Sequence, residues 1–201
     1  MRLLILIYFL LVALTTPAWA LAATNDFTLN SLMKLLASKQ ESSGTFVELR
    51  YNSLLKNPVR ITGKLYYKKP DLLIKENLAP VAETLKIKGD SITYEKLENG
   101  KKISRTLAVE DFPFLKTMVV GLRATFAGNL DSLKNNYNVT LTGNRADWRL
   151  DLITNVVETD PDKLFDNIVT KLVISGSGTD FRKIEMFDQE NDRTVINISP
   201  L

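Results

Sequence analysis

Alternation of apolar and polar residues runs through most of this chain. Within residues 59–68, Ile61, Leu65 and Tyr67 fall on one side of an extended backbone and the lysines fall on the other. A period of two is the pattern of a β-strand with one dry face and one wet face. The pattern recurs between turn signals, of which Asn99-Gly100 is the strongest because this pair favours a two-residue hairpin. The sequence therefore predicts a long meander of strands.

The predicted meander has one helical interruption. We expect about eleven strands, at residues 45–54, 59–68, 71–77, 83–88, 91–97, 102–109, 137–143, 147–154, 168–174, 181–188 and 193–198. Apolar residues at helical spacing predict helices at 25–38, 112–127 and 130–135. The first helix has Thr28 or Asp26 as its cap, after which Ser43-Gly44 breaks the pattern. Pro113 and Gly128 mark the two ends of the second helix.

The number of strands limits the shape of the sheet. Because strands twist, an antiparallel sheet of about eleven strands cannot stay flat and must curl. Its concave face needs cover, and the two amphipathic helices at 25–38 and 112–127 are the only material for it. These helices are small compared with the sheet. An incompletely filled concavity follows as an expectation.

The first residues predict export. Arg2 precedes an apolar run from Leu3 to Leu14, and Ala18-Trp19-Ala20 ends in small residues. This is the pattern of a secretory signal peptide over residues 1–20, cut after Ala20 or alternatively one of the next two alanines. The apolar run is shorter than the ~20 residues that span a bilayer, although an uncleaved anchor is the alternative. We expect a single domain over 21–201, located in the periplasm.

Composition excludes several classes of function. The chain has no histidine and no cysteine, which excludes Ser-His-Asp and Cys-His catalysis, ordinary zinc sites, disulfides and acylation of an N-terminal cysteine. The formal net charge of +3 falls to about +2 without the leader, and the lysines are scattered, so no nucleic-acid partner is expected.

The remaining candidates for chemistry are weak. Asp160, Asp162 and Asp166 lack the glycine and glutamate of a calcium loop and are better interpreted as helix-capping residues. Gly176-Ser177-Gly178 opens no helix, which favours a turn over a phosphate site. A carboxylate-based hydrolase would need paired acids, for which only Glu76 or Glu83 is available at inward positions. We expect no enzyme, no metal and no cofactor.

Four motifs carry a family resemblance. They are Ser43-Gly44-Thr45-Phe46-Val47-Glu48, Gly63-Lys64-Leu65-Tyr66-Tyr67-Lys68-Lys69-Pro70-Asp71, Lys88-Gly89-Asp90-Ser91-Ile92-Thr93 and Leu122-Arg123-Ala124-Thr125-Phe126-Ala127-Gly128-Asn129-Leu130. In this order they resemble the periplasmic lipoprotein carriers of the LolA type, and more closely the LolA-related proteins found with bacterial lipid-export and aryl-polyene pathways. The resemblance covers nearly the whole chain after the leader.

The resemblance implies a fold and a function. The family fold is an unclosed (half) β-barrel of about eleven antiparallel strands, mostly β with α, in which helices form a lid over an apolar cavity. The implied function is a monomeric carrier, or chaperone, that takes acylated lipoprotein or lipid cargo from an inner-membrane donor complex or exporter to an outer-membrane acceptor. The alternatives are a carrier of another lipid, such as an aryl-polyene or glycolipid conjugate, and an adaptor domain that docks on an exporter.

The candidate lipid-binding residues are apolar. On the strands they are Leu49, Tyr51, Ile61, Leu65, Tyr67, Leu72, Ile74, Leu85, Ile87 and Ile92, and on the lid they are Leu115, Met118, Val119 and Leu122. LolA proper usually carries an arginine, implicated in lid closing and cargo handover, where this chain has Lys69. Lysine is a point donor that cannot reproduce the planar fork of arginine, so cargo other than a lipoprotein is a serious alternative.

Overall fold

The computed structural model describes residues 27–111, 113–155, 169–190 and 192–201. Its strands are β1 (Glu41–Tyr51), β2 (Val59–Lys68), β3 (Leu72–Ala79), β4 (Glu83–Lys88), β5 (Ser91–Glu98), β6 (Lys101–Ala108), β7 (Tyr137–Asn144), β8 (Asp147–Thr154), β9 (Val169–Ser177), β10 (Asp180–Asp188) and β11 (Arg193–Pro200). Its helices are α2 (Leu29–Ser38), the short 3₁₀ helix η1 (Val109–Asp111), α3 (Pro113–Ala127) and α4 (Leu130–Asn136).

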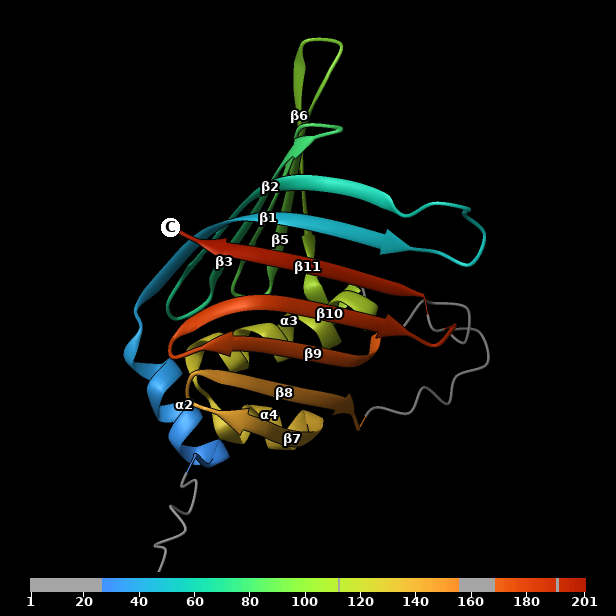
Figure 1. Ribbon diagram of the computed structural model, residues 1–201. Helices are drawn as coiled ribbons and strands as arrows, with labels where there is room; N and C mark the ends of the chain where they lie inside the picture. Colours follow the sequence, from blue (N-terminus) through green and yellow to red (C-terminus); the bar gives the residue numbers. More distant parts are fainter. Residues whose placement is uncertain (1–26, 112, 156–168, 191) are drawn as a thin grey trace, which may run out of the picture.

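All of these strands belong to one antiparallel sheet (Figure 1). The order is β6-β5-β4-β3-β2-β1-β11-β10-β9-β8-β7, so strands that are consecutive in sequence pair, except β6 and β7, and β1 also pairs with β11. That pairing runs in register from Gly44 opposite Pro200 to Tyr51 opposite Arg193. In the part of the chain that the structure describes, β6 and β7 are the free edges. The predicted unclosed, mostly β fold with helices is confirmed.

The helices lie on one side of the curled sheet, and α3 and α4 connect its two edges. The chain leaves β6, runs through η1, α3 and α4, and enters the sheet again at β7. The β5–β6 hairpin extends far beyond the helices, which cover only part of the sheet (Figure 1). Within the described residues, no helix is long and apolar enough to cross a membrane.

Aromatic side chains join α3 to both halves of the sheet. Phe126 of α3 packs edge-on against Tyr67 of β2, with ring centroids 5.1 Å apart, and against Phe181 of β10 at 4.3 Å. Phe181 in turn contacts Trp148 of β8 at 5.7 Å. Trp148 is completely buried, as the alternation around it predicts. The core therefore runs across the concave side under α3.

The local predictions hold with two corrections. Asn99 and Gly100 have φ of 52° and 74°, which is the backbone of a tight hairpin turn. Helix α2 begins at Leu29 and not at residue 25, because Thr28 caps it by accepting a hydrogen bond from the Ser31 amide at 3.2 Å. The remaining predicted strands and helices agree with the observed ones to within about three residues, as is usual for element ends.

The second correction concerns Gly44. Ser43-Gly44 does not break the pattern, because β1 already begins at Glu41. A Cβ at Gly44 would lie 2.8 Å from the Ser199 carbonyl oxygen of β11, so the glycine permits a close approach between strands. The predicted capping turn with Asp160, Asp162 and Asp166, and the signal peptide over 1–20, lie outside the described residues.

Tyr137 anchors α3 to the sheet. It is 3% exposed, and its hydroxyl donates a hydrogen bond to the Thr117 carbonyl oxygen in α3. Gly121 makes room for it, since a Cβ there would lie 2.8 Å from the Tyr137 hydroxyl. Burial raises the pKa of Tyr137 to about 12. The phenol thus remains a donor in the folded protein over the whole physiological range.

This anchor predicts a pH-dependent stability. Near pH 7 the Tyr137→Phe variant should be less stable than the wild type by about 1 kcal/mol, the net value of one hydrogen bond. An unfolded tyrosine titrates at pH ~10, whereas Tyr137 in the folded protein titrates at about 12. Between these two pH values the Tyr137 hydroxyl keeps its proton only when the protein is folded. The wild type should therefore lose stability over this range and its advantage should shrink. Urea denaturation at pH 8 and pH 11 measures both values.

The exposed Tyr51 supplies the control. Tyr51→Phe also removes one phenol, and the change with pH in the difference for Tyr137→Phe is judged against it. An equal gap for Tyr137→Phe at the two pH values would contradict the assigned anchor.

Candidate functional site

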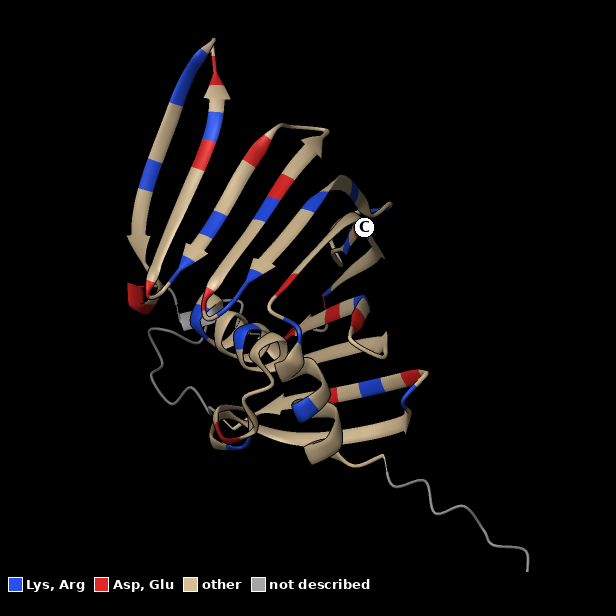
Figure 2. Ribbon diagram, turned by 90° about the vertical axis from the view of Figure 1, so that its left-hand side faces the viewer, with Lys and Arg blue, Asp and Glu red and all other residues tan. Residues whose placement is uncertain are grey.

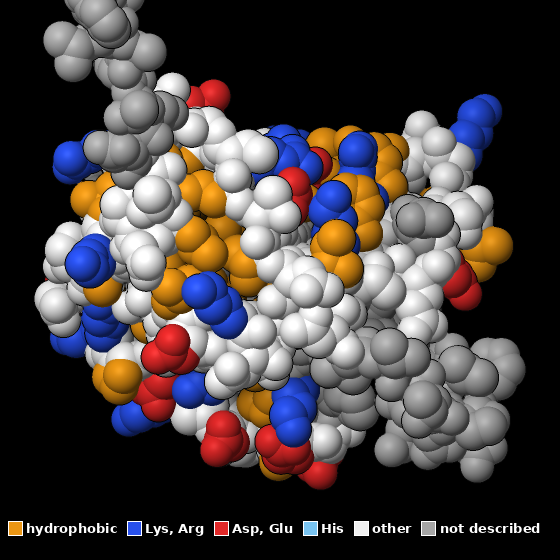
Figure 3. Space-filling view, turned by 90° about the horizontal axis from the view of Figure 1, so that it is seen from below, with side chains coloured by type: hydrophobic (Ala, Val, Ile, Leu, Met, Phe, Trp, Pro, Cys, Tyr) orange, Lys and Arg blue, Asp and Glu red, His pale blue; other side chains and the backbone are white. Residues whose placement is uncertain are grey.

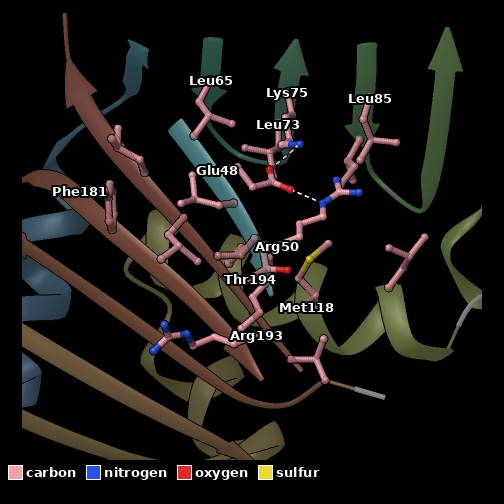
Figure 4. Close-up of a pocket in the computed structure, with 18 of the residues that line it drawn as sticks. Glu48, Arg50, Leu65, Leu73, Lys75, Leu85, Met118, Phe181, Arg193 and Thr194 are labelled. Carbon is pink, nitrogen blue, oxygen red and sulfur yellow. Dashed lines mark hydrogen bonds and ion pairs between the residues drawn. The ribbon is translucent and has the colours of Figure 1, made fainter. Parts of the chain in front are cut away.

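A cavity of about 610 Å³ lies between the concave face of the sheet and α3. Its apolar wall comes from β2 to β4, from β10 and β11, and from α3. The side chains are Leu65, Tyr67, Leu73, Leu85, Ile87, Phe181, Ile184, Met186, Ile196, Ile198, Leu115, Met118, Leu122 and Phe126. Figure 4 shows Leu65, Leu73 and Leu85 on one side of the cavity and Met118 of α3 on another. The helices leave this part of the concave face unfilled.

Most of the predicted lipid-binding residues contact this space. Those lining the cavity are Tyr51, Leu65, Tyr67, Leu85, Ile87, Leu115, Met118 and Leu122. Tyr51 differs from the others, because its ring lies against the Arg193 guanidinium, 4.6 Å from the ring centroid. Ile61, Ile92 and Val119 do not line the cavity and instead belong to the packed core, where each is 6% exposed or less.

Leu49, Leu72 and Ile74 are corrections to the expected lining. None of them lines the cavity. In β3 the reason is the register, which places Leu73 opposite Tyr67 and Leu72 opposite Lys68. Paired residues share a face of the sheet, so Leu73 points inward with Tyr67. Leu72 and Ile74 take the other face.

The same alternation of side chains between the two faces of the sheet applies to β1. Its buried positions are Gly44, Phe46 and Glu48, which leaves Leu49 on the opposite face. The sequence is ambiguous here because Val47 and Leu49 are as apolar as Phe46. Only the partner strands decide which set points inward.

A group of charged residues, missed by the sequence prediction, lies in the cavity wall. Glu48 is 2% exposed, and its two carboxylate oxygens lie 2.5 Å from Arg50 Nε and 2.8 Å from Lys75 Nζ. The Lys75 ammonium also donates to Asn77 Oδ1 at 2.9 Å and lies 5.0 Å from the centre of the Phe46 ring. Figure 4 shows Glu48 between its two cationic partners. We call Glu48, Arg50 and Lys75 the charged triad.

Hydrogen bonds connect the triad through Asn77 to Glu83 and Tyr94 along the sheet. The Asn77 side-chain amide donates to Glu83 at 2.6 Å, and the Tyr94 hydroxyl donates to the same carboxylate at 2.7 Å. The hydrogen bond to Glu83 raises the pKa of Tyr94. Glu83 is thus held by neutral donors and does not face a second acid. Glu76 pairs in register with Lys64 and Thr84, on the other face.

Three cationic side chains attach the helices to hairpin ends. Lys69 donates from Nζ to the Ala37 carbonyl oxygen in the last turn of α2. Lys39, just after α2, pairs with Asp180 of β10 at 2.7 Å. Arg123 of α3 donates to the Gly89 carbonyl oxygen at 2.9 Å. Because α3 covers the cavity and α2 packs against α3, these contacts hold the cover in place.

A comparison of sequences identifies the family. A family model described as "Outer membrane lipoprotein carrier protein LolA-like" matches residues 21–197. The chain belongs to the LolA-like family. The resemblance to the LolA type that the sequence motifs carry is thereby confirmed. A search of curated proteins finds no match.

Solved structures of similar fold have low sequence identity to this LolA-like chain. The LolA superfamily protein NE2245 from Nitrosomonas europaea has 9% identity, with 86% of this chain and 91% of that chain covered and a TM-score of 0.41. A DUF1329 family protein from Desulfovibrio piger has 13% identity, coverage of 85% and 88%, and a TM-score of 0.43. LprF from Mycobacterium bovis has 13% identity, coverage of 85% and 91%, and a TM-score of 0.38. The family assignment rests on the sequence match alone.

The charges on the surface of this LolA-like protein are mixed. Lysine, arginine and acidic residues follow one another along the strands in Figure 2, and both signs are interspersed on the face seen in Figure 3. Among the described residues, no group of three or more acids is placed to hold a metal ion. The apolar cavity with its charged triad is the principal candidate site.

The triad makes a prediction about stability. Lys75→Met should destabilise the fold by about 3 kcal/mol, because it leaves a buried carboxylate with one half-exposed partner. The double variant Glu48→Leu with Lys75→Met should recover most of this loss, since it removes the buried charge as well. Urea denaturation gives the free energies of unfolding.

Lys102 provides a matched control for Lys75. It pairs with Glu95 at 3.0 Å on the surface, so Lys102→Met should cost less than about 1 kcal/mol. A Lys75→Met variant as stable as Lys102→Met would show that the triad is not a coupled buried group.

Proposed function

We propose that this protein is a non-enzymatic carrier that shields the acyl chains of a lipoprotein or lipid on the way to the outer membrane. The observation that carries the proposal is the apolar cavity of about 610 Å³ beneath α3. This volume falls within the range of about 300–1,000 Å³ that is usual for ligand sites. Membership of the LolA-like family supports the same conclusion.

An acyl chain needs a carrier in water because exposing its hydrocarbon to water costs free energy. Each CH₂ group of an acyl chain exposed to water costs about 0.8 kcal/mol. A carrier must also release its cargo, so its net affinity has to be a difference between similar terms. Leu115, Met118 and Leu122 of α3 face the cavity. When cargo binds, these side chains replace their contacts with the sheet by contacts with an acyl chain. Binding and release then remain in balance.

A role without catalysis agrees with the residues present. The chain has no histidine or cysteine, and the acids near the cavity are engaged. Glu48 binds two cations, and Glu83 accepts from Asn77 and Tyr94. Glu48 and Glu83 are therefore not placed as a pair of facing carboxylates for acid–base work.

The proposed route runs through the periplasm. The leader over residues 1–20 would direct export, and the domain over 21–201 would act as a monomer between an inner-membrane donor complex or exporter and an outer-membrane acceptor. Lys69 occupies the place where LolA proper usually carries an arginine, and it binds a carbonyl group of α2. We propose that it holds the lid during transport and yields at handover.

Cavity occupancy can be tested at Met118. Met118→Arg should lower the affinity for a fluorescent fatty acid, such as cis-parinaric acid, by more than about tenfold, because a guanidinium in an apolar cavity resists burial. Met118→Leu should leave the affinity nearly unchanged, since the volumes are similar. Fluorescence titration measures both. Failure of the wild type to bind, or equal binding by Met118→Arg, would contradict the proposal.

The lid function can be tested at Lys69. Lys69→Met removes a charge-assisted hydrogen bond to α2, which is worth about 1.5–3 kcal/mol, so release of the bound probe should accelerate about tenfold or more. The control is Lys68→Met. The side chain of Lys68 is exposed, and its closest ion-pair partner, Glu41, lies 4.0 Å away. Stopped-flow mixing with acceptor vesicles measures the release rates. Equal rates in the two variants would exclude a lid function for Lys69.

A further inference from the structure

The charged triad places a net positive charge at one part of the cavity wall, while Arg193, Asp188 and Asp192 elsewhere in the lining bring the total of its charged residues to zero. Arg50 and Lys75 supply two cations against the single carboxylate of Glu48, and all three residues line the cavity. The remaining wall is largely apolar, so water is a poor competitor there and a charge acts more strongly than on the surface. A wall that served only hydrocarbon would need no charge.

The three members of the triad differ in how far their bonding capacity is used. Glu48 directs one oxygen to each cation, and Lys75 also binds Asn77 and lies over Phe46. Arg50 uses only Nε, in its bond to Glu48. Its side chain is 50% exposed, and within the described residues its two terminal nitrogens have no hydrogen-bond partner. These nitrogens carry four N–H donors in a fixed plane.

The acids at the rim of the cavity do not use these donors. Asp192 accepts from the Asn52 side chain and from the Ser53 amide at 2.9 Å. Asp188 accepts from the amides of Glu190 and Asp192, each at 2.9 Å. Both carboxylates therefore hold turns together. In the described part of the chain, neither is paired with Arg50.

We propose that the terminal nitrogens of Arg50 bind an anionic group on the cargo, a phosphate or a carboxylate, while its hydrocarbon chain occupies the apolar part of the cavity. The inference rests on the proposed carrier function and narrows its cargo to anionic amphiphiles. The planar guanidinium suits two-point binding of either anion. Glu48 holds Arg50 in position, and Lys75 neutralises the charge of Glu48.

The test compares ligands that share one chain length. Dodecyl phosphate, dodecanoate and neutral 1-monolauroylglycerol each displace the apolar fluorophore N-phenyl-1-naphthylamine from the full-length protein. We expect the wild type to bind at least one anionic ligand about tenfold more tightly than the neutral one, a difference of 1.4 kcal/mol. Preference for dodecyl phosphate would indicate a phosphate head, and preference for dodecanoate would indicate a carboxylate.

Arg50→Gln should abolish this preference and leave the affinity for 1-monolauroylglycerol unchanged, which also shows that the variant is folded. The matched control is Arg193→Gln, which removes the same charge from the neighbouring strand, where Arg193 stacks on Tyr51. It should retain the preference. Raising the salt concentration should weaken binding of the anionic ligand only.

Three outcomes would overturn the inference. Equal affinity of the wild type for neutral and anionic ligands would refute anion recognition while leaving the carrier intact. Retention of the preference in Arg50→Gln would refute the role of Arg50. Failure of all three ligands to displace the fluorophore would refute the carrier and the anion site together.

Discussion

The pairing of β1 with β11 is the constraint on which the rest of the structure depends. It joins strands from opposite ends of the described chain, from Gly44 opposite Pro200 to Tyr51 opposite Arg193. Two meanders thereby become one sheet whose free edges are β6 and β7. The chain travels from one edge to the other through η1, α3 and α4, which cross the concave side. The lid is thus a consequence of connectivity as much as of apolar contact.

The cavity follows from a mismatch between sheet and helices. A twisted sheet of this size curls, and Phe126 of α3 contacts both halves of it, through Tyr67 and through Phe181. Beyond these contacts, the inward side chains of β2 to β4 face space instead of a helix. Polar attachments at Lys69, Lys39 and Arg123 keep the cover in place without filling that space.

The charged triad adds a polar, charged region to this otherwise apolar cavity. Burying Glu48 is costly unless its charge is compensated, and two cations on the same face provide the compensation. A purely structural role would be met by the pair Glu48–Lys75. The third member, Arg50, leaves an unused planar donor at the wall, which connects an apolar carrier site to the recognition of an anionic head.

The sequence by itself determined the strands, the helices and the turns, because alternation, helical spacing and the Asn99-Gly100 turn are local signals. It also determined the family through its ordered motifs. The tertiary structure alone decided which face of β1 and β3 points inward. Phe46 and Val47 are neighbours, as are Leu72 and Leu73, and each pair offers an apolar residue to either face. Register with the partner strands resolves the ambiguity and brings Glu48, Arg50 and Lys75 together across the sheet.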